Sequence, residues 1–370
     1  MNFDLIFALI FYGLLLLFYF KNKSKFARQG ILLLYRTKVG IKLMDKFSRH
    51  RLLLNILSYF SILIGFLGMF LILYILIRGT YSLIFIPDSP PVLAPVLPGI
   101  KIPGLPTLSF WHWIISIFII AVIHEFAHGI YARLYKIKIK SSGFAFLGPI
   151  LAAFVEPDEK VMKKVSNKKQ LAIISAGPFV NIVFAFLILL FIQFIFFPFI
   201  FNSDGITVVN IEKDSPASLA NLQPGIIIRE VNNLEVTDPT QVVELIQSSQ
   251  GKEMEFLTDR GEFFIKPVMK DNKYYIGISV THHVKPSVEW FYMLLYWLWV
   301  ISFGIGLFNL LPLGPIDGGR IFYVAMLSFF NEKKSMKLFK SISIFCLILI
   351  IINLMPYLIK LFKWIIGLFS

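Results

Sequence analysis

The segment His124-Glu125-Phe126-Ala127-His128 combines two imidazoles and a carboxylate at a spacing that suits metal-assisted hydrolysis. Residues four apart lie on one face of an α-helix, so His124 and His128 can bind one Zn²⁺ ion. Glu125, one position further along, can reach a water molecule beside that ion and act as its general base. The alternative is a chance match in which both histidines are hydrogen-bonded core residues.

The surroundings of this segment favour the catalytic interpretation. Between residues 109 and 129 the only ionisable side chains are those of His112, His124, Glu125 and His128, and the stretch is apolar enough to span a membrane. Ionisable groups at membrane depth are costly unless a metal, a partner or water offsets the cost, so they mark functional sites by default. The combination predicts hydrolysis inside the bilayer.

A third zinc ligand must come from elsewhere, because a tetrahedral catalytic site takes three protein ligands and keeps one open position. Asp317 is the best candidate, since Pro312, Gly314 and Pro315 interrupt the apolar run that precedes it. Broken helices are tolerated at membrane depth where they are buried in protein or line a wet cavity, so this one can carry a carboxylate into the bundle. Equally, Asp317 can simply cap the next helix at the end of the span.

A second polar group at membrane depth is Asn181, at the end of the sequence SAGPFVN. Small residues let helices approach closely, and Pro178 opens the backbone nearby. Both a catalytic role and a packing role fit Asn181.

The composition is that of a polytopic α-helical membrane protein. Of the 370 residues, 57% are hydrophobic, well above the usual share in soluble proteins. The first apolar run has neither a basic leader nor a small-residue cleavage site, which favours a retained helix over a signal peptide. Six apolar runs have spanning length: residues 3–20, 56–77, 110–134, 171–200, 288–311 and 338–357.

Charge predicts the orientation. Residues 21–51 carry ten Lys and Arg against Asp45 alone, and residues 133–169 carry nine Lys and Arg, so both loops are expected in the cytoplasm. Eight helical residues separate His128 from Lys136, which puts the zinc about 12 Å inside the cytoplasmic side. The net charge of +14 is concentrated in these loops, which favours anionic lipid headgroups over nucleic acid as the partner.

Residues 203–285 have a different character and are expected to form an α+β extracytoplasmic domain. They carry twelve Asp and Glu against eight Lys and Arg, with strand-like runs at 206–211, 226–231, 254–258 and 275–280. Helices are predicted near 215–220 and 239–250. The predicted division of the chain is 1–55 for an N-terminal helix and basic loop, 56–202 and 286–370 for the membrane core, and 203–285 for the insert.

Three motifs resemble the site-2 protease family of intramembrane zinc metalloproteases: HEFAH in one membrane helix, AGPFVN in the next and NLLPLGPIDGG in a later one. They match that family in type, order and spacing, and cover residues 110 to 325. The resemblance implies that His124, His128 and Asp317 bind one zinc ion and that Glu125 is the catalytic base.

The same resemblance implies that Asn181 and Asn309 line the substrate or active-site region. It also places the family's membrane-associated β-hairpin, thought to guide substrate, at residues 137–159. The run SPASLANLQPGIIIREVNNLEV resembles a PDZ domain, which this family often carries here. A peptide would then add as a strand beside Gly205, Ile206, Thr207 and Val208; the alternative is a spacer or filter domain whose groove is empty or blocked.

These features together predict a zinc-dependent intramembrane endopeptidase that cleaves transmembrane segments of membrane proteins, as in regulated intramembrane proteolysis. A non-catalytic, membrane-anchored peptide receptor or chaperone is the main alternative, but a structural metal site has no use for a base such as Glu125. A metal transporter would need polar residues along the membrane normal, whereas here they cluster at one depth. Cys346 is the only cysteine, which excludes an intrachain disulfide and a multi-cysteine zinc site.

Overall fold

The computed structural model describes residues 3–30, 32–87, 89–100, 102, 104–147, 150–201 and 204–367. It divides into two compact units, one of residues 1–189 and 294–370 and the other of residues 190–293. The predicted domain boundary at residues 202 and 203 lies outside the described residues.

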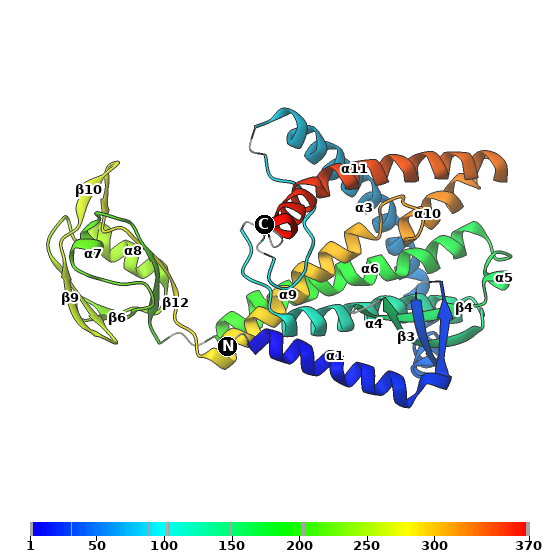
Figure 1. Ribbon diagram of the computed structural model, residues 1–370, viewed down its shortest axis with the longest axis horizontal. Coiled ribbons are helices and arrows are strands. Elements are labelled where there is room, and N and C mark those ends of the chain that lie inside the picture. Colours follow the sequence, from blue (N-terminus) through cyan, green and yellow to red (C-terminus); the bar gives the residue numbers. More distant parts are fainter. Residues whose placement is uncertain are drawn as a thin grey trace. The chain divides into compact units, whose positions relative to one another are not determined.

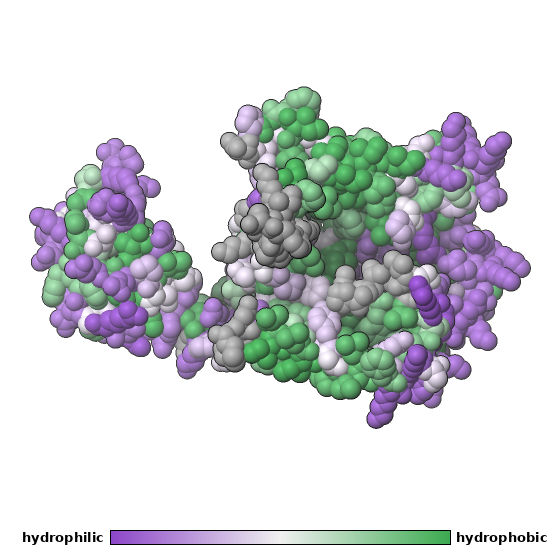
Figure 2. Space-filling model, in the orientation of Figure 1, coloured by the Kyte–Doolittle hydropathy of each residue, from purple (hydrophilic) through white to green (hydrophobic). Residues whose placement is uncertain are grey.

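Among the described residues, six helices are long and apolar enough to cross a membrane, which confirms the predicted number. Their outward faces expose large apolar side chains, and Figure 2 shows hydrophobic surface over the helices of the larger unit and hydrophilic surface at one end of it. The helices are α1 (Phe3–Lys21), α3 (Arg51–Phe85), α4 (Phe110–Leu134), α6 (Asn167–Phe191, continued by a π-helical segment over Ile192–Ile200), α9 (Pro286–Phe308) and α11 (Glu332–Gly367).

Small residues bring these helices close together. A Cβ atom at Gly65 of α3 would meet the side chain of Ser175 on α6, at 2.8 Å from its Oγ, and one at Gly68 would overlap the side chain of Leu310. Without a hydrophobic driving force in lipid, close van der Waals packing of this kind is what holds membrane helices together. Helix α3 therefore supports both α6 and the chain segment that follows α9.

The expected hairpin is present as β3 (Ile139–Leu147) and β4 (Ile150–Pro157), but it belongs to a larger sheet (Figure 1). The segment predicted as a basic loop folds into a 3₁₀ turn (Lys23–Lys25) and strands β1 (Phe26–Gln29) and β2 (Leu32–Thr37). All four strands pair antiparallel in the order β1-β2-β3-β4. Strand β4 is thus an edge strand among the described residues.

Aromatic contacts explain why this basic segment becomes a hairpin. The ring of Tyr35 lies 5.1 Å from that of Phe18 on α1 and 5.2 Å from that of Phe26, and Phe26 lies 5.7 Å from Phe146 of β3. Such ring pairs add stability beyond the area that they bury. The cluster joins α1 to both hairpins.

Short helix α2 (Ile41–Phe47) follows β2 and packs on α4. Met44 is buried against Gly129, Asp45 forms an ion pair with Arg133, and the ring of Phe47 lies 5.9 Å from that of Phe126. The N-terminal segment is therefore fixed to the helix that carries the histidines. Two further helices of this unit are α5 (Glu159–Met162) and α10 (Asp317–Met326).

Helix α11 departs from expectation. In the last thirty residues, Pro356, Lys360 and Lys363 leave too little for two full spans and predict one span followed by an interfacial amphipathic helix. The structure instead has a single helix over Glu332–Gly367 (Figure 1). A proline removes one N–H donor and bends a helix, yet in an apolar segment the remaining backbone groups still require intrahelical partners. The helix therefore continues through Pro356.

The smaller unit contains the predicted α+β domain. Its sheet has the order β12-β5-β6-β8-β9, with β7 paired to β6 and with β10 and β11 forming a separate hairpin. Buried Ile206, Ile228 and Phe256 belong to its core. The elements are β5 (Ile206–Ile211), α7 (Pro216–Leu219), β6 (Ile227–Val231), β7 (Leu234–Glu235), α8 (Pro239–Ser248), β8 (Met254–Thr258), β9 (Gly261–Ile265), β10 (Val268–Lys270), β11 (Lys273–Tyr275) and β12 (Ile278–His282).

The predicted peptide-binding edge, at Gly205, Ile206, Thr207 and Val208, is wrong. Strand β5 is an interior strand, because it pairs with β12 on one side and with β6 on the other. The strand at the open edge near α8 is β12. His282 at its end lies 3.4 Å from the carboxylate of Asp238, the N-cap residue of α8.

Candidate active site

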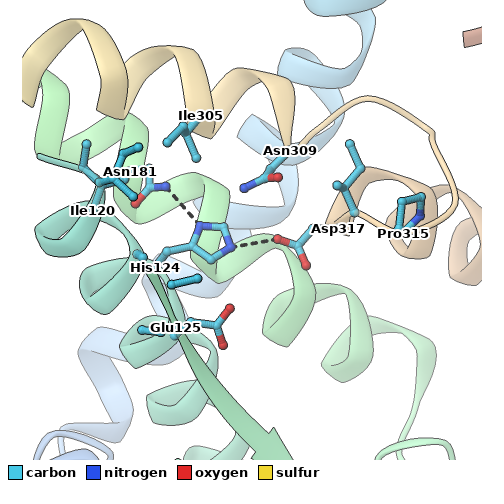
Figure 3. A pocket seen from close by; sticks show the side chains of 13 residues that line it. Ile120, His124, Glu125, Asn181, Ile305, Asn309, Pro315 and Asp317 are labelled. Carbon is cyan, nitrogen blue, oxygen red and sulfur yellow. Dashed lines mark hydrogen bonds and ion pairs between the residues drawn. The ribbon is translucent and has the colours of Figure 1, made fainter. Parts of the chain in front are cut away.

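Three side chains from two distant parts of the chain converge in the membrane unit. The Nε2 atoms of His124 and His128 lie 3.1 Å apart, and the Asp317 Oδ2 atom lies 3.0 Å from the first and 3.3 Å from the second. Both histidines lie on one face of α4, as their spacing predicts, and Asp317 begins α10. Figure 3 shows the His124 ring pointing towards the Asp317 carboxylate.

The chain reversal after α9 explains how Asp317 reaches this place. Helix α9 ends at Phe308, and the backbone N–H of Gly318 donates to the carbonyl of Asn309 at 2.6 Å, which closes the intervening loop. A Cβ atom at Gly318 would overlap the backbone of Leu310 and Leu311, so only glycine allows this crossing. Asp317 therefore combines the two alternatives left open by the sequence, because it opens α10 and also enters the bundle.

The arrangement fits a tetrahedral zinc site. Metal–ligand bonds of about 2.0–2.1 Å place neighbouring donor atoms about 3.3 Å apart, close to the three separations observed here. Space for an ion is left by Gly177 on α6. A Cβ atom there would overlap His128 Nε2 and would lie 2.6 Å from His124 Nε2.

The other ring nitrogens have partners that orient the ligands. His128 Nδ1–H donates to the carbonyl of Ile173 at 2.7 Å, which leaves the Nε2 lone pair available to a metal. His124 Nδ1 lies 3.0 Å from Asn181 Nδ2, and the buried Oδ1 atom of Asn181 has no hydrogen-bond partner among the described residues. A carboxamide can present either its nitrogen or its oxygen, and with Oδ1 facing the ring Asn181 would hold His124 in the same metal-binding tautomer.

Glu125 is placed by the hairpin. The backbone N–H of Val155 on β4 donates to Glu125 Oε2 at 2.9 Å, so the carboxylate lies between α4 and the edge strand. Figure 3 shows the Glu125 carboxylate on the same side of α4 as the His124 ring. The predicted base therefore neighbours the predicted ligands.

His124, Glu125, Asn181 and Asp317 line one cavity of about 330 Å³. The small side chains of Ala152 and Ala153 on β4 form one wall, and Asn309 and Asn181 face it from α9's C-terminal end and α6 (Figure 3). The full lining is Ile117, Ile120, Ala121, His124, Glu125, Ala152, Ala153, Asn181, Ile305, Asn309, Pro315, Ile316 and Asp317. The cavity lies beside His124 and Asp317 and has the size of a small ligand-binding pocket.

Three contributors were not singled out from the sequence. Gly177 lies within the SAGPFVN motif, and small residues in an apolar helix are a sequence signal of close helix packing. Ile173 and Val155 act only through backbone groups, for which side-chain identity gives no signal. Gly205–Val208 belong to the inserted domain and contribute nothing to the arrangement described for the membrane unit.

Comparisons with known proteins identify the family of this chain. The family model of peptidase family M50 matches residues 112–354. An uncharacterized protein of Methanocaldococcus jannaschii is 30% identical over 299 residues, which cover 79% of this chain and 77% of that protein.

Two solved structures are similar to about a fifth of the chain. The PDZ domain of an SdrC-like protein from Listeria innocua is 25% identical, with a TM-score of 0.20, and covers 22% of this chain and 97% of its own. The corresponding domain from Listeria monocytogenes is 23% identical, also with a TM-score of 0.20, and covers 22% and 90%. With the family model spanning the helices that carry HEFAH and the Asp317 loop, the chain belongs to peptidase family M50, the site-2 protease family of membrane metalloproteases.

Proposed function

We propose that this protein is a zinc-dependent endopeptidase that cleaves transmembrane segments of other membrane proteins. The observation that carries the proposal is the triangle of His124, His128 and Asp317 atoms, 3.0–3.3 Å on each side, with Glu125 lining the same cavity as His124 and Asp317. The cavity lies among helices long enough to cross a membrane.

Each residue has a distinct part in hydrolysis. His124, His128 and Asp317 would hold Zn²⁺, which when bound polarises a peptide carbonyl and activates water. Glu125 would accept the proton from the attacking water and then deliver it to the leaving amine. The Val155 N–H holds one oxygen of Glu125, which leaves the other oxygen available for the proton.

The substrate must present an extended segment. In a helix the carbonyls are already hydrogen-bonded, so the transmembrane segment has to unwind locally, which Gly, Pro and Asn favour. Strand β4 offers an open edge beside the cavity, with the small residues Ala152 and Ala153. An unwound segment can add to this edge as a further strand, in keeping with a substrate-guiding role for the hairpin.

The orientation proposed from charge puts the zinc site nearer the cytoplasmic side of the cell membrane. Lys and Arg in residues 21–51 and 133–169 would face the cytoplasm and contact anionic lipid headgroups. Cleavage would then release a fragment into the cytoplasm. The inserted domain would lie on the opposite, extracytoplasmic side.

The inserted domain is proposed to bind peptide between β12 and α8. Strand β12 has an open edge among the described residues, and an extended peptide can pair with such an edge. Asp238 at the start of α8 is held by Thr240, whose side-chain hydroxyl and backbone N–H lower the pKa of the Asp238 carboxyl below its usual value. Asp238 therefore stays charged at neutral pH and pairs with His282 at one end of this groove.

A test of this role replaces residues 203–285 by a flexible linker. All proposed ligands and the base lie outside the insert, so zinc binding and cleavage of a short model substrate should survive. A linker of about ten Gly and Ser residues reaches about 17 Å, enough to join neighbouring helix ends. If the domain excludes bulky ectodomains or selects a newly exposed terminus, the variant should cleave full-length substrates that the intact enzyme spares.

The measurement is the ratio of cleavage rates for full-length and pre-trimmed forms of one substrate, in both proteins. An equal ratio in the two would remove the selective role of the insert. Loss of cleavage of the short substrate, with zinc still bound, would show that the insert shapes the active site.

Asp317→Asn should weaken zinc binding, because a charged oxygen ligand becomes a poorer, neutral one. Zinc per chain after dialysis against a weak chelator is the readout, and a parallel loss of proteolysis is expected. Asp204→Asn, a carboxylate of the inserted domain, is the matched control. Unchanged zinc content in Asp317→Asn would move the third ligand elsewhere.

A further inference from the structure

A second cavity lies on the other side of the β4–α4 contact. It holds about 240 Å³ and is almost entirely apolar, with Glu125 as the one charged residue among the described residues that line it. Its lining comes from β2 and the turn into α2, from one face of α4 and from the hairpin: Thr37, Val39, Gly40, Met44, Phe118, Val122, Glu125, Phe126, Ser142, Gly143, Phe144, Ala153, Phe154 and Val155.

Helix α4 presents a different face to each cavity. Phe118, Val122 and Phe126 recur every four residues and form a stripe that faces the second cavity, whereas His124 faces the first. Glu125 lies at the border and lines both cavities, as does Ala153 on β4. A peptide held beside Glu125 in the first cavity would therefore lie next to the apolar second cavity, which we call the recess.

The walls of this recess are held in place by specific contacts. The hydroxyl of Ser142 on β3 donates to the carbonyl of Val39 at 2.7 Å, and that of Thr37 donates to the carbonyl of Ser142 at 3.1 Å. Gly40, with φ of +84°, makes the left-handed turn into α2. The recess is preformed rather than a gap between loosely packed parts.

Four of the fourteen residues that line the recess, Thr37, Val39, Gly40 and Met44, lie outside the region that the family model matches, which starts at residue 112. These residues belong to segment 37–44, and α2 holds the segment against α4 through Met44 and the Asp45–Arg133 ion pair. The N-terminal segment thus contributes one side of the recess.

We propose that this recess binds one large apolar side chain of the substrate, next to the scissile bond, and so determines where the enzyme cuts. The proposal rests on the proposed proteolysis. A cavity of about 150 Å³ lined by apolar side chains binds benzene, so the 240 Å³ recess has room for a side chain of the size of Leu or Phe. Close van der Waals packing of such a side chain against Phe118, Val122 and Phe126 supplies the selectivity for its shape.

A lipid acyl chain is a weaker candidate for the same space. An acyl chain gains little on leaving bilayer hydrocarbon for an apolar recess, because both surroundings are apolar. A substrate side chain reaches the recess on a backbone that is already positioned beside Glu125. The experiment below separates these two occupants.

The test changes Val122, which lines the recess on α4 and is not among the proposed ligands or base. Val122→Trp fills the recess and Val122→Ala enlarges it. Leu187→Trp, on an exposed face of α6, is the matched control for adding an indole to a membrane helix. The substrate is one transmembrane peptide with Ala, Leu, Phe or Trp at each position flanking the cleavage site that mass spectrometry locates.

For the wild-type enzyme we expect one flanking position at which Leu or Phe is cleaved at least about tenfold faster than Ala, as apolar pockets discriminate by such factors. Val122→Trp should reverse this preference towards Ala, and Val122→Ala should admit Trp. Leu187→Trp should keep the wild-type preference.

Two results would overturn the proposal. If Val122→Trp lowered the rate equally for all substrates, the recess would hold lipid or serve packing only. If both Val122 variants kept the wild-type preference, the specificity would come from elsewhere. Absence of any cleavage that depends on Glu125 in the wild-type protein would instead contradict the proposed proteolysis itself.

Discussion

Glu125→Gln is expected to abolish proteolysis while leaving zinc bound. The amide has nearly the shape of the carboxylate, and its oxygen can still accept the hydrogen bond from the Val155 N–H, but it cannot take a proton from water. Loss of a positioned general base lowers rates by about 10²- to 10⁴-fold. Cleavage of a transmembrane model substrate and zinc content per chain are measured on the same preparation.

Measuring zinc content together with cleavage separates a loss of catalysis from a loss of the metal. Zinc content equal to the wild-type value would show that the fold and the ligands are intact, so that the loss lies in proton transfer. Retention of more than a few per cent of the wild-type activity would exclude Glu125 as the base. A peptide receptor or chaperone, the alternative function, would be indifferent to this substitution.

Gly177→Ala is expected to remove zinc and activity together. Its new Cβ would overlap the Nε2 atom of His128 and crowd that of His124, which is where a shared ion has to bind. Alanine favours a helix interior over glycine by about 0.5–1 kcal/mol, so the substitution should not weaken α6 by itself. Zinc per chain and proteolysis are the readouts.

Gly304→Ala is the matched control, because a Cβ atom at that helical glycine of α9 meets nothing within 4 Å. It should keep both zinc and activity. Full zinc occupancy in Gly177→Ala would contradict the placement of the ion between His124 and His128 beside α6.

The local parts of the site were predictable from sequence. The spacing of His124 and His128 fixes their common face as soon as they are on a helix, and the apolar stretch around them requires a helix in a membrane. The broken helix before Asp317 made it a candidate ligand with a helix cap as the equal alternative. The resemblance to a family was needed to choose between them, since nothing in this segment states which distant helix Asp317 meets.

The parts of the fold that the sequence did not predict depend on pairing between strands that are far apart in the chain. Residues 26–37 were predicted as a loop because their charges suggest solvent or lipid headgroups, whereas their pairing partner β3 lies more than 100 residues away. The peptide-binding edge was misplaced for the same reason, because β12 comes from the far end of the insert and covers β5. Strand order within a sheet is set by tertiary contacts that a local pattern does not encode.

The most direct test is cleavage of a single-span substrate by the purified enzyme in liposomes, with the products sequenced by mass spectrometry. The account predicts a cut within the membrane segment that disappears after zinc is removed by a chelator, returns when zinc is added back and is absent in Glu125→Gln. Cuts confined to the flanking loops, or a cut within the membrane that persists without zinc, would contradict it.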